Sequence, residues 1–103
     1  MREFTCVRLG SVSSPRRVVM GTSATSAAAV DALSRAARRS RDAGAEVVWL
    51  GGGVGAPVLA AVAVAEDADE VAVGPSDDVA AVRSGLDAAG APDVMVEAVE
   101  PGA

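Results

Sequence analysis

The sequence predicts an α/β fold built on a small, doubly wound parallel sheet of flavodoxin-like type. Short apolar runs, such as residues 18–21 (VVMG) and 46–50 (EVVWL), alternate with longer segments that carry apolar residues at helical spacing. Strands without alternating polar positions are typical of parallel sheets whose two faces are both covered by helices. Right-handed crossovers between such strands favour the strand order 2-1-3-4. At 103 residues the chain has room for one hydrophobic core.

The first half of this pattern is strand, helix, strand. Residues 18–21 are the first expected strand, and residues 22–26 (TSATS) after it are rich in side chains that cap helices. Apolar residues then recur at helical spacing over about 23–42, with the arginines of this segment mostly facing solvent. Gly44 is suited to end this helix, and residues 46–50 are the second strand.

The second half repeats the alternation. Pro57 fits the first turn of a helix that runs to about residue 66. Residues 70–74 are the third expected strand, and Ser76 after it is a suitable N-cap for a helix that ends near Gly90. Residues 93–99 (DVMVEAV) are the fourth strand.

Residues 1–15 are expected to form an N-terminal extension and linker, ahead of an α/β domain over residues 16–103. Polar and apolar residues alternate in residues 3–9 (EFTCVRL), which fits an antiparallel edge strand or a contact between two copies. The segment lacks the apolar core of a signal peptide, and Cys6 is the only cysteine of the chain. We therefore expect a cytoplasmic protein without an internal disulfide.

Composition excludes several classes of function. The formal net charge of -5 disfavours binding to nucleic acid or to an anionic membrane surface. The chain contains no histidine, which excludes Ser-His-Asp and Cys-His nucleophile systems and removes the commonest metal ligand. We therefore expect no metal site.

Two segments of the chain resemble the cobalamin-binding domain superfamily found in methylmalonyl-CoA mutase and corrinoid proteins. They are residues 41–74 (RDAGAEVVWLGGGVGAPVLAAVAVAEDADEVAVG) and residues 86–96 (LDAAGAPDVMV). The similarity extends over roughly residues 16–99. It implies the same doubly wound fold and a ligand held at the carboxyl ends of the strands.

The motifs by which that family holds cobalamin differ here. The family's Asp-x-His-x-x-Gly motif corresponds to residues 21–28 (GTSATSAA), and its Ser-x-Leu motif to residues 74–78 (GPSDD). Residues 97–99 (EAV) stand where the family has a Gly-Gly turn, and its fifth strand and last helix have no counterpart. We therefore predict no cofactor, with cobalamin bound without a protein axial ligand as an alternative.

The candidate ligand site lies at the carboxyl edge of the sheet, where doubly wound folds bind ligands. Hydroxyl groups and backbone N–H groups there could hold a carboxylate or a phosphate. The loop at residues 51–55 (GGGVG) is favoured as a sharp turn with positive φ, with an anion cradle as the alternative. The candidate ligand-binding residues are Gly21, Thr22, Ser23, Thr25, Gly52, Gly53, Gly74 and Ser76.

Four further residues are candidates for other roles. Asp77 and Asp78 are expected to complement the helix dipole, with catalysis as a weaker alternative. Trp49, on the edge strand of this topology, and Phe4 are candidate interface residues. A four-stranded sheet with two exposed edges also favours a homo-oligomer such as a dimer.

These observations favour a stand-alone accessory or binding subunit of a larger mutase-like enzyme or of a tailoring enzyme of specialised metabolism, without catalysis of its own. One alternative is a small enzyme without histidine, or a binder of small acids, that uses the crevice above the first and third strands. A second alternative is a protein that binds cobalamin in the base-on form.

Overall fold

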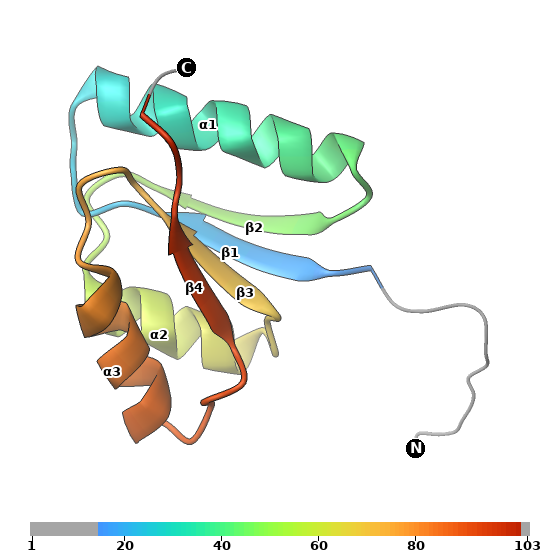
Figure 1. Cartoon of the computed structure of the whole chain (residues 1–103), viewed down its shortest axis with the longest axis vertical. Helices are drawn as coiled ribbons and strands as arrows, with labels where there is room; N and C mark the ends of the chain where they lie inside the picture. The colour runs from blue at the N-terminus through green and yellow to red at the C-terminus, as the bar shows by residue number, and fades with distance from the viewer. Residues whose placement is uncertain (1–14, 102–103) are drawn as a thin grey trace.

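Residues 15–101, the part of the chain that the computed structural model describes, form one all-parallel sheet with three helices (Figure 1). The strand order is β2-β1-β3-β4, which confirms the predicted fold class and strand order. The strands are β1 (Arg17–Gly21), β2 (Glu46–Gly51), β3 (Glu70–Val73) and β4 (Met95–Ala98). The helices are α1 (Ala27–Asp42), α2 (Ala56–Ala65) and α3 (Val79–Ala88). Phe4 and the predicted extension up to residue 14 lie outside the described residues.

The two central strands are apolar because both of their faces are covered. Val19 of β1 lies between Val48 of β2 and Val71 of β3, and it is fully buried. The edge strands β2 and β4 are less buried along their length. Apolar runs without alternation therefore fit the buried central strands, although the edge strand β2 carries a similar run.

The two faces of the sheet are covered unequally. Helices α2 and α3 pack side by side on one face, around a core that includes Leu59, Val71 and Leu86 (Figure 1). Among residues 15–101, α1 is the one helix on the other face, where it packs on β1 and β2. Its core is small and contains Leu33 and Met20.

The helices begin where a side chain can cap them. Ser26 caps α1, because its Oγ accepts a hydrogen bond from the N–H of Ala29 at 3.3 Å, so α1 begins four residues after the predicted start. The predicted N-cap Ser76 is wrong. Asp78 caps α3 instead, and its carboxylate accepts from the N–H of Ala81 at 3.1 Å.

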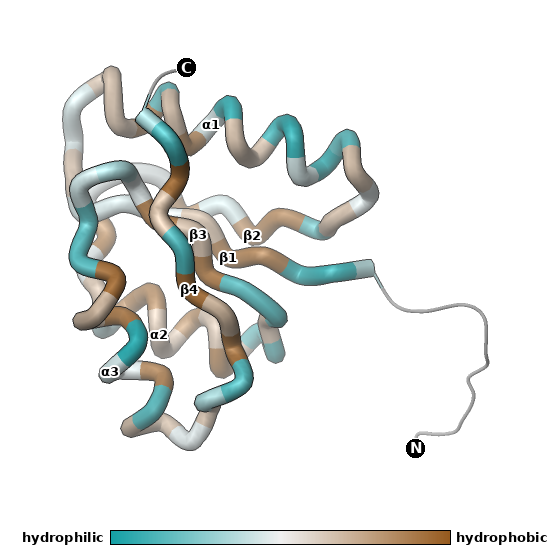
Figure 2. The backbone as a smooth tube through the Cα atoms, viewed as in Figure 1, coloured by the Kyte–Doolittle hydropathy of each residue, from teal (hydrophilic) through white to brown (hydrophobic). Residues whose placement is uncertain are grey.

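The helices differ in how polar their outer sides are. Figure 2 shows hydrophilic positions along the outer side of α1, whereas α2 has no charged residue in its ten positions. None of the helices in residues 15–101 has the length and apolar character that a bilayer crossing requires.

Candidate functional site

The loops that follow β1 and β3 meet at the carboxyl edge of the sheet, where ligand binding is predicted. Asp77 joins them, because its carboxylate accepts hydrogen bonds from the N–H of Ser23 at 3.1 Å and from the N–H of Gly74 at 2.8 Å. The hydroxyl of Ser23 donates to the same carboxylate. Asp77 therefore connects the loop after β3 to Ser23, which lies 54 positions earlier in the sequence.

The hydrogen bonds to Asp77 fix its charge. Partial burial raises the pKa of the Asp77 carboxyl, but the bonds from Ser23, Thr22 and Gly74 together outweigh it, so this pKa is lowered from its ordinary value. The group is therefore an anion at neutral pH whose oxygen atoms already accept several hydrogen bonds. Such a carboxylate is suited to hold loops together rather than to donate or accept a proton in catalysis.

Close packing explains two of the predicted glycines. A Cβ atom on Gly74 would lie 2.9 Å from Cβ of Thr22 and would collide with its hydroxyl. A Cβ atom on Gly21 would lie 2.9 Å from the side chain of Leu59. Both positions are buried, so the absence of a side chain there serves packing.

The glycine-rich loop after β2 is a turn that docks on the β1–α1 loop. The predicted positive φ is present at Gly51 (81°) and Gly53 (73°). The N–H of Gly53 donates to the carbonyl of Ala24 at 3.2 Å, and the N–H of Val54 donates to the carbonyl of Thr22 at 2.9 Å. Because these two N–H groups are engaged within the protein, they do not form an open cradle for an anion.

The structure brings only some of the predicted ligand-binding residues together. Thr22, Ser23 and Gly74 surround the Asp77 carboxylate, whereas Thr25 and Ser76 are exposed beside them. Gly52 lies against the β1–α1 loop, since a Cβ atom there would be 2.9 Å from the carbonyl oxygen of Ala24. The ligand-binding roles of these residues stay predictions.

The space at this edge is small. A crevice of about 110 Å³ is bounded by Ser23, Asp77 and Asp78 on one side and by Val54 and Leu59 on the other. Pockets for small molecules usually measure roughly 300 to 1,000 Å³. The two carboxylates among its lining residues also disfavour an anionic ligand.

Cobalamin does not fit the residues at this edge. The chain has no histidine to bind cobalt, and the loop after β1 is closed by Asp77 and by the glycine-rich turn. No group of three or more potential metal-ligating side chains lies together within residues 15–101.

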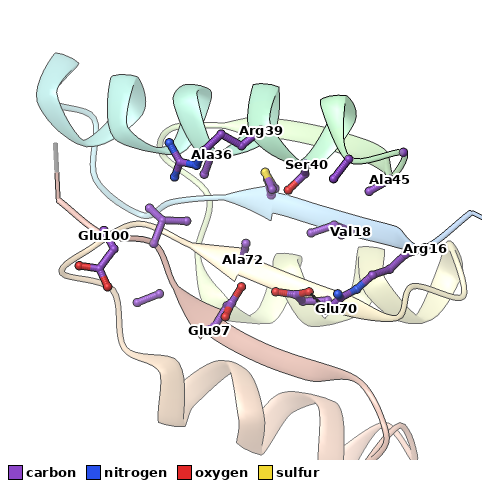
Figure 3. Close-up of a pocket in the computed structure, with 15 residues that line it drawn as sticks. Arg16, Val18, Ala36, Arg39, Ser40, Ala45, Glu70, Ala72, Glu97 and Glu100 are labelled. Carbon is purple, nitrogen blue, oxygen red and sulfur yellow. Dashed lines mark hydrogen bonds and ion pairs between the residues drawn. The ribbon is translucent and has the colours of Figure 1, made fainter. Parts of the chain in front are cut away.

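A larger opening lies on the half-covered face of the sheet, and sequence reasoning missed it. The groove measures about 620 Å³, and Figure 3 shows it between α1 and the far strands of the sheet. Val18, Met20 and Ala72 form an apolar floor. Arg39 of α1 stands on one side, and Glu97 of β4 lies on the other.

A buried carboxyl lies at the edge of this floor. The side chain of Glu70 is 6% exposed and forms an ion pair with the more exposed Arg16. Burial raises the pKa of Glu70 to about 7, and the adjacent Glu97 carboxyl adds to this rise, whereas Arg16 opposes it. Figure 3 shows the side chains of Glu70 and Glu97 directed toward each other. In the sequence, Glu70 is the first residue of the third expected strand, directly after an acidic segment, and no local pattern marks it as buried.

Trp49, the predicted interface residue on β2, is 39% exposed. It lies in register with Met20 and therefore on the side of the sheet that carries α1. Its interface role stays a prediction.

Comparisons with models of protein families, with curated proteins and with solved structures found no match.

Replacement of Gly74 by alanine tests the close packing at the carboxyl edge. We expect Gly74→Ala to lower the free energy of unfolding by about 1 to 3 kcal/mol, because the added methyl group collides with Thr22. Chemical denaturation measures the change. Gly55→Ala is the control, since its Cβ atom would lie 3.6 Å from the nearest atom, and it should cost less than about 1 kcal/mol. Equal effects of the two substitutions would contradict the packing argument.

The raised pKa of Glu70 predicts that stability falls as pH rises. Between pH 4.5 and about 7 the folded chain keeps a proton on Glu70 that the unfolded chain has released. The stabilising contribution of this proton to the folded state is therefore complete below about pH 4.5 and is lost as the pH rises past about 7. We expect a loss on the order of 2 kcal/mol across this window. Glu70→Gln should remove this slope, whereas Glu46→Gln, at an exposed position of the edge strand β2, should keep it. Denaturation curves at a series of pH values measure it, and an unchanged slope in Glu70→Gln would contradict the assignment.

Proposed function

We propose that the chain is a non-catalytic accessory subunit that docks on a larger enzyme through the half-covered face of its sheet. The observation that carries the proposal is the groove between α1 and β4. All-parallel sheets occur almost only with both faces covered, and here β3 and β4 have no helix on this face within the described residues. A cover supplied by another protein would complete the sheet.

The dimensions and the charge of the groove favour a basic amphipathic helix of the partner. Two neighbouring strands span about 10 Å, which matches the diameter of a helix. The floor residues Val18, Met20 and Ala72 are apolar but already buried, so a partner helix would add only a shallow apolar contact there. Glu97 and Glu100 line the groove beside β4, so arginine or lysine side chains of the partner would meet carboxylates there. Glu70 is already paired with Arg16, and Arg39 on the α1 side would face a carboxylate of the partner.

Exposed apolar surface continues along the edge of the same face. Met95 of β4 is 61% exposed, and it is paired in register with Glu70, which places it on the face of the groove. Large apolar side chains at a surface with a polar rim are typical of protein interaction sites. The carboxyl edge of the sheet is a weaker candidate for a partner contact, because Asp77 and the glycine-rich turn already form hydrogen bonds within the chain.

The resemblance to cobalamin-binding domains agrees with this proposal, because those domains are parts of larger enzymes. The larger enzyme would be a mutase-like enzyme or a tailoring enzyme of specialised metabolism. The chain would contribute binding and assembly, while the partner carries the catalytic residues. Nothing in this proposal requires cobalamin.

Affinity purification from the native host tests the proposal. The tagged chain should retain a larger enzyme in stoichiometric amount, and that enzyme should lose activity when the chain is removed. Glu97→Arg should weaken this association at least tenfold, because it places a like charge opposite a basic helix. Asp31→Arg is the matched control, since it makes the same charge change at an exposed position of α1, and it should leave binding unchanged.

Three outcomes would overturn the proposal. The first is equal binding of the partner by both variants. The second is turnover by the purified chain alone that is lost in Asp78→Asn. The third is stoichiometric co-elution of hydroxocobalamin with the purified chain, which would show the family ligand bound without histidine.

A further inference from the structure

Helix α2 carries an exposed apolar stripe on the side away from the sheet. Leu59, Ala60 and Ala63 are buried, and Ala60 packs so closely on α3 that a Cβ atom on Gly85 would lie 3.0 Å from its methyl carbon. The exposed positions are Pro57, Val58, Ala61, Val64 and Ala65. Val58 is 52% exposed and Val64 is 43% exposed. A helix that is apolar all round is normally buried, so this stripe is a candidate surface for a partner.

We propose that two copies of this chain pair through α2 as an antiparallel helix pair with a two-fold axis at Ala61. The stripe is symmetric about Ala61, because Val58 and Val64 lie three positions on either side of it and Pro57 and Ala65 lie four positions away. In an antiparallel pair each Val58 therefore faces Val64 of the other copy. Ala61 meets its own equivalent at the axis, where its small side chain lets the two helices approach closely.

Self-complementarity of this kind favours a second copy over a different protein. An interface with two-fold symmetry uses the same patch on both subunits, so it must match itself in shape and in charge. The ten residues of α2 include no charged side chain, although the chain as a whole has a net charge of -5. The stripe is therefore a surface where two acidic chains can meet without direct repulsion.

The charges at the two ends of α2 select the antiparallel direction. The first turn has no acidic residue and no side chain that caps it, so the partial positive charge of this end is not neutralised locally. Glu66 and Asp67 follow the last turn and are exposed. In an antiparallel pair these carboxylates lie near the positive end of the other helix, whereas a parallel pair would place the four carboxylates together.

Sedimentation equilibrium of the full chain tests the pairing. We expect a reversible dimer of micromolar affinity, because two ten-residue helices form a small contact. Ala61→Glu should weaken it about 100-fold, since it places two carboxylates at the axis. Ala28→Glu is the matched control, because it puts the same side chain at an exposed alanine of α1, and it should dimerise like the unmodified chain. A monomer at high micromolar concentration, or equal effects of both variants, would overturn the proposal.

Cross-linking tests the direction of the helices. In a Cys6→Ser background, Ala61→Cys should form a covalent dimer with a short bismaleimide at least tenfold faster than Val58→Cys or Val64→Cys alone. The combined Val58→Cys and Val64→Cys variant should cross-link as fast as Ala61→Cys. Equal cross-linking of the three single variants would indicate a parallel pair and would overturn the antiparallel arrangement. Circular dichroism of each variant checks that the fold is kept.

Discussion

The architecture depends on one constraint, which is that a parallel sheet must be covered on both faces. Its strands cannot be joined by tight hairpins, so each crossover carries a helix to one face or the other. With the order β2-β1-β3-β4, the three crossovers place α2 and α3 on one face and α1 on the other. One face is therefore covered by two helices, and half of the opposite face is open in residues 15–101 (Figure 1). The groove is a direct consequence of this topology.

Asp77 illustrates how a polar residue at an expected ligand site can hold the fold together instead. Sheets of this kind bind ligands where the loops after the central strands diverge. Here the Asp77 carboxylate joins those loops to each other, and residues 51–55 form three backbone hydrogen bonds with the β1–α1 loop. Asp77 and Ser23 are thereby engaged in contacts within the chain, whereas the side chains of Thr25 and Ser76 stay exposed beside them.

The sequence was sufficient for the fold because local signals and topology agreed. Short apolar strands that alternate with helices indicated a parallel sheet covered on both faces, and the flavodoxin-like order 2-1-3-4 was the favoured arrangement. The cap of α3 was assigned to Ser76 rather than Asp78 because both side chains are good caps. The pairing of Asp77 with Ser23 spans 54 positions and leaves no local pattern. The same is true of the groove, since its walls come from α1, β3 and β4.

Glu70 and α2 show a different limit of sequence reasoning. The carboxyl of Glu70 is conspicuous only because the fold buries it beside an apolar floor, next to a second carboxyl from β4. The apolar composition of α2 is visible in the sequence, but its exposed side is known only once α3 and the sheet have covered the other sides. In both cases the informative quantity is the burial of a residue relative to its polarity.

The two proposed contacts lie on opposite faces of the sheet, so they do not compete for the same surface (Figure 1). A two-fold pair through α2 would leave both grooves facing outward, and each groove could accept a helix of a partner. The assembly would then contain two copies of this chain and two partner subunits around one axis. This arrangement separates the two proposals experimentally. A change at Ala61 should leave the partner bound to a single copy, and a change at Glu97 should leave the pair of copies intact.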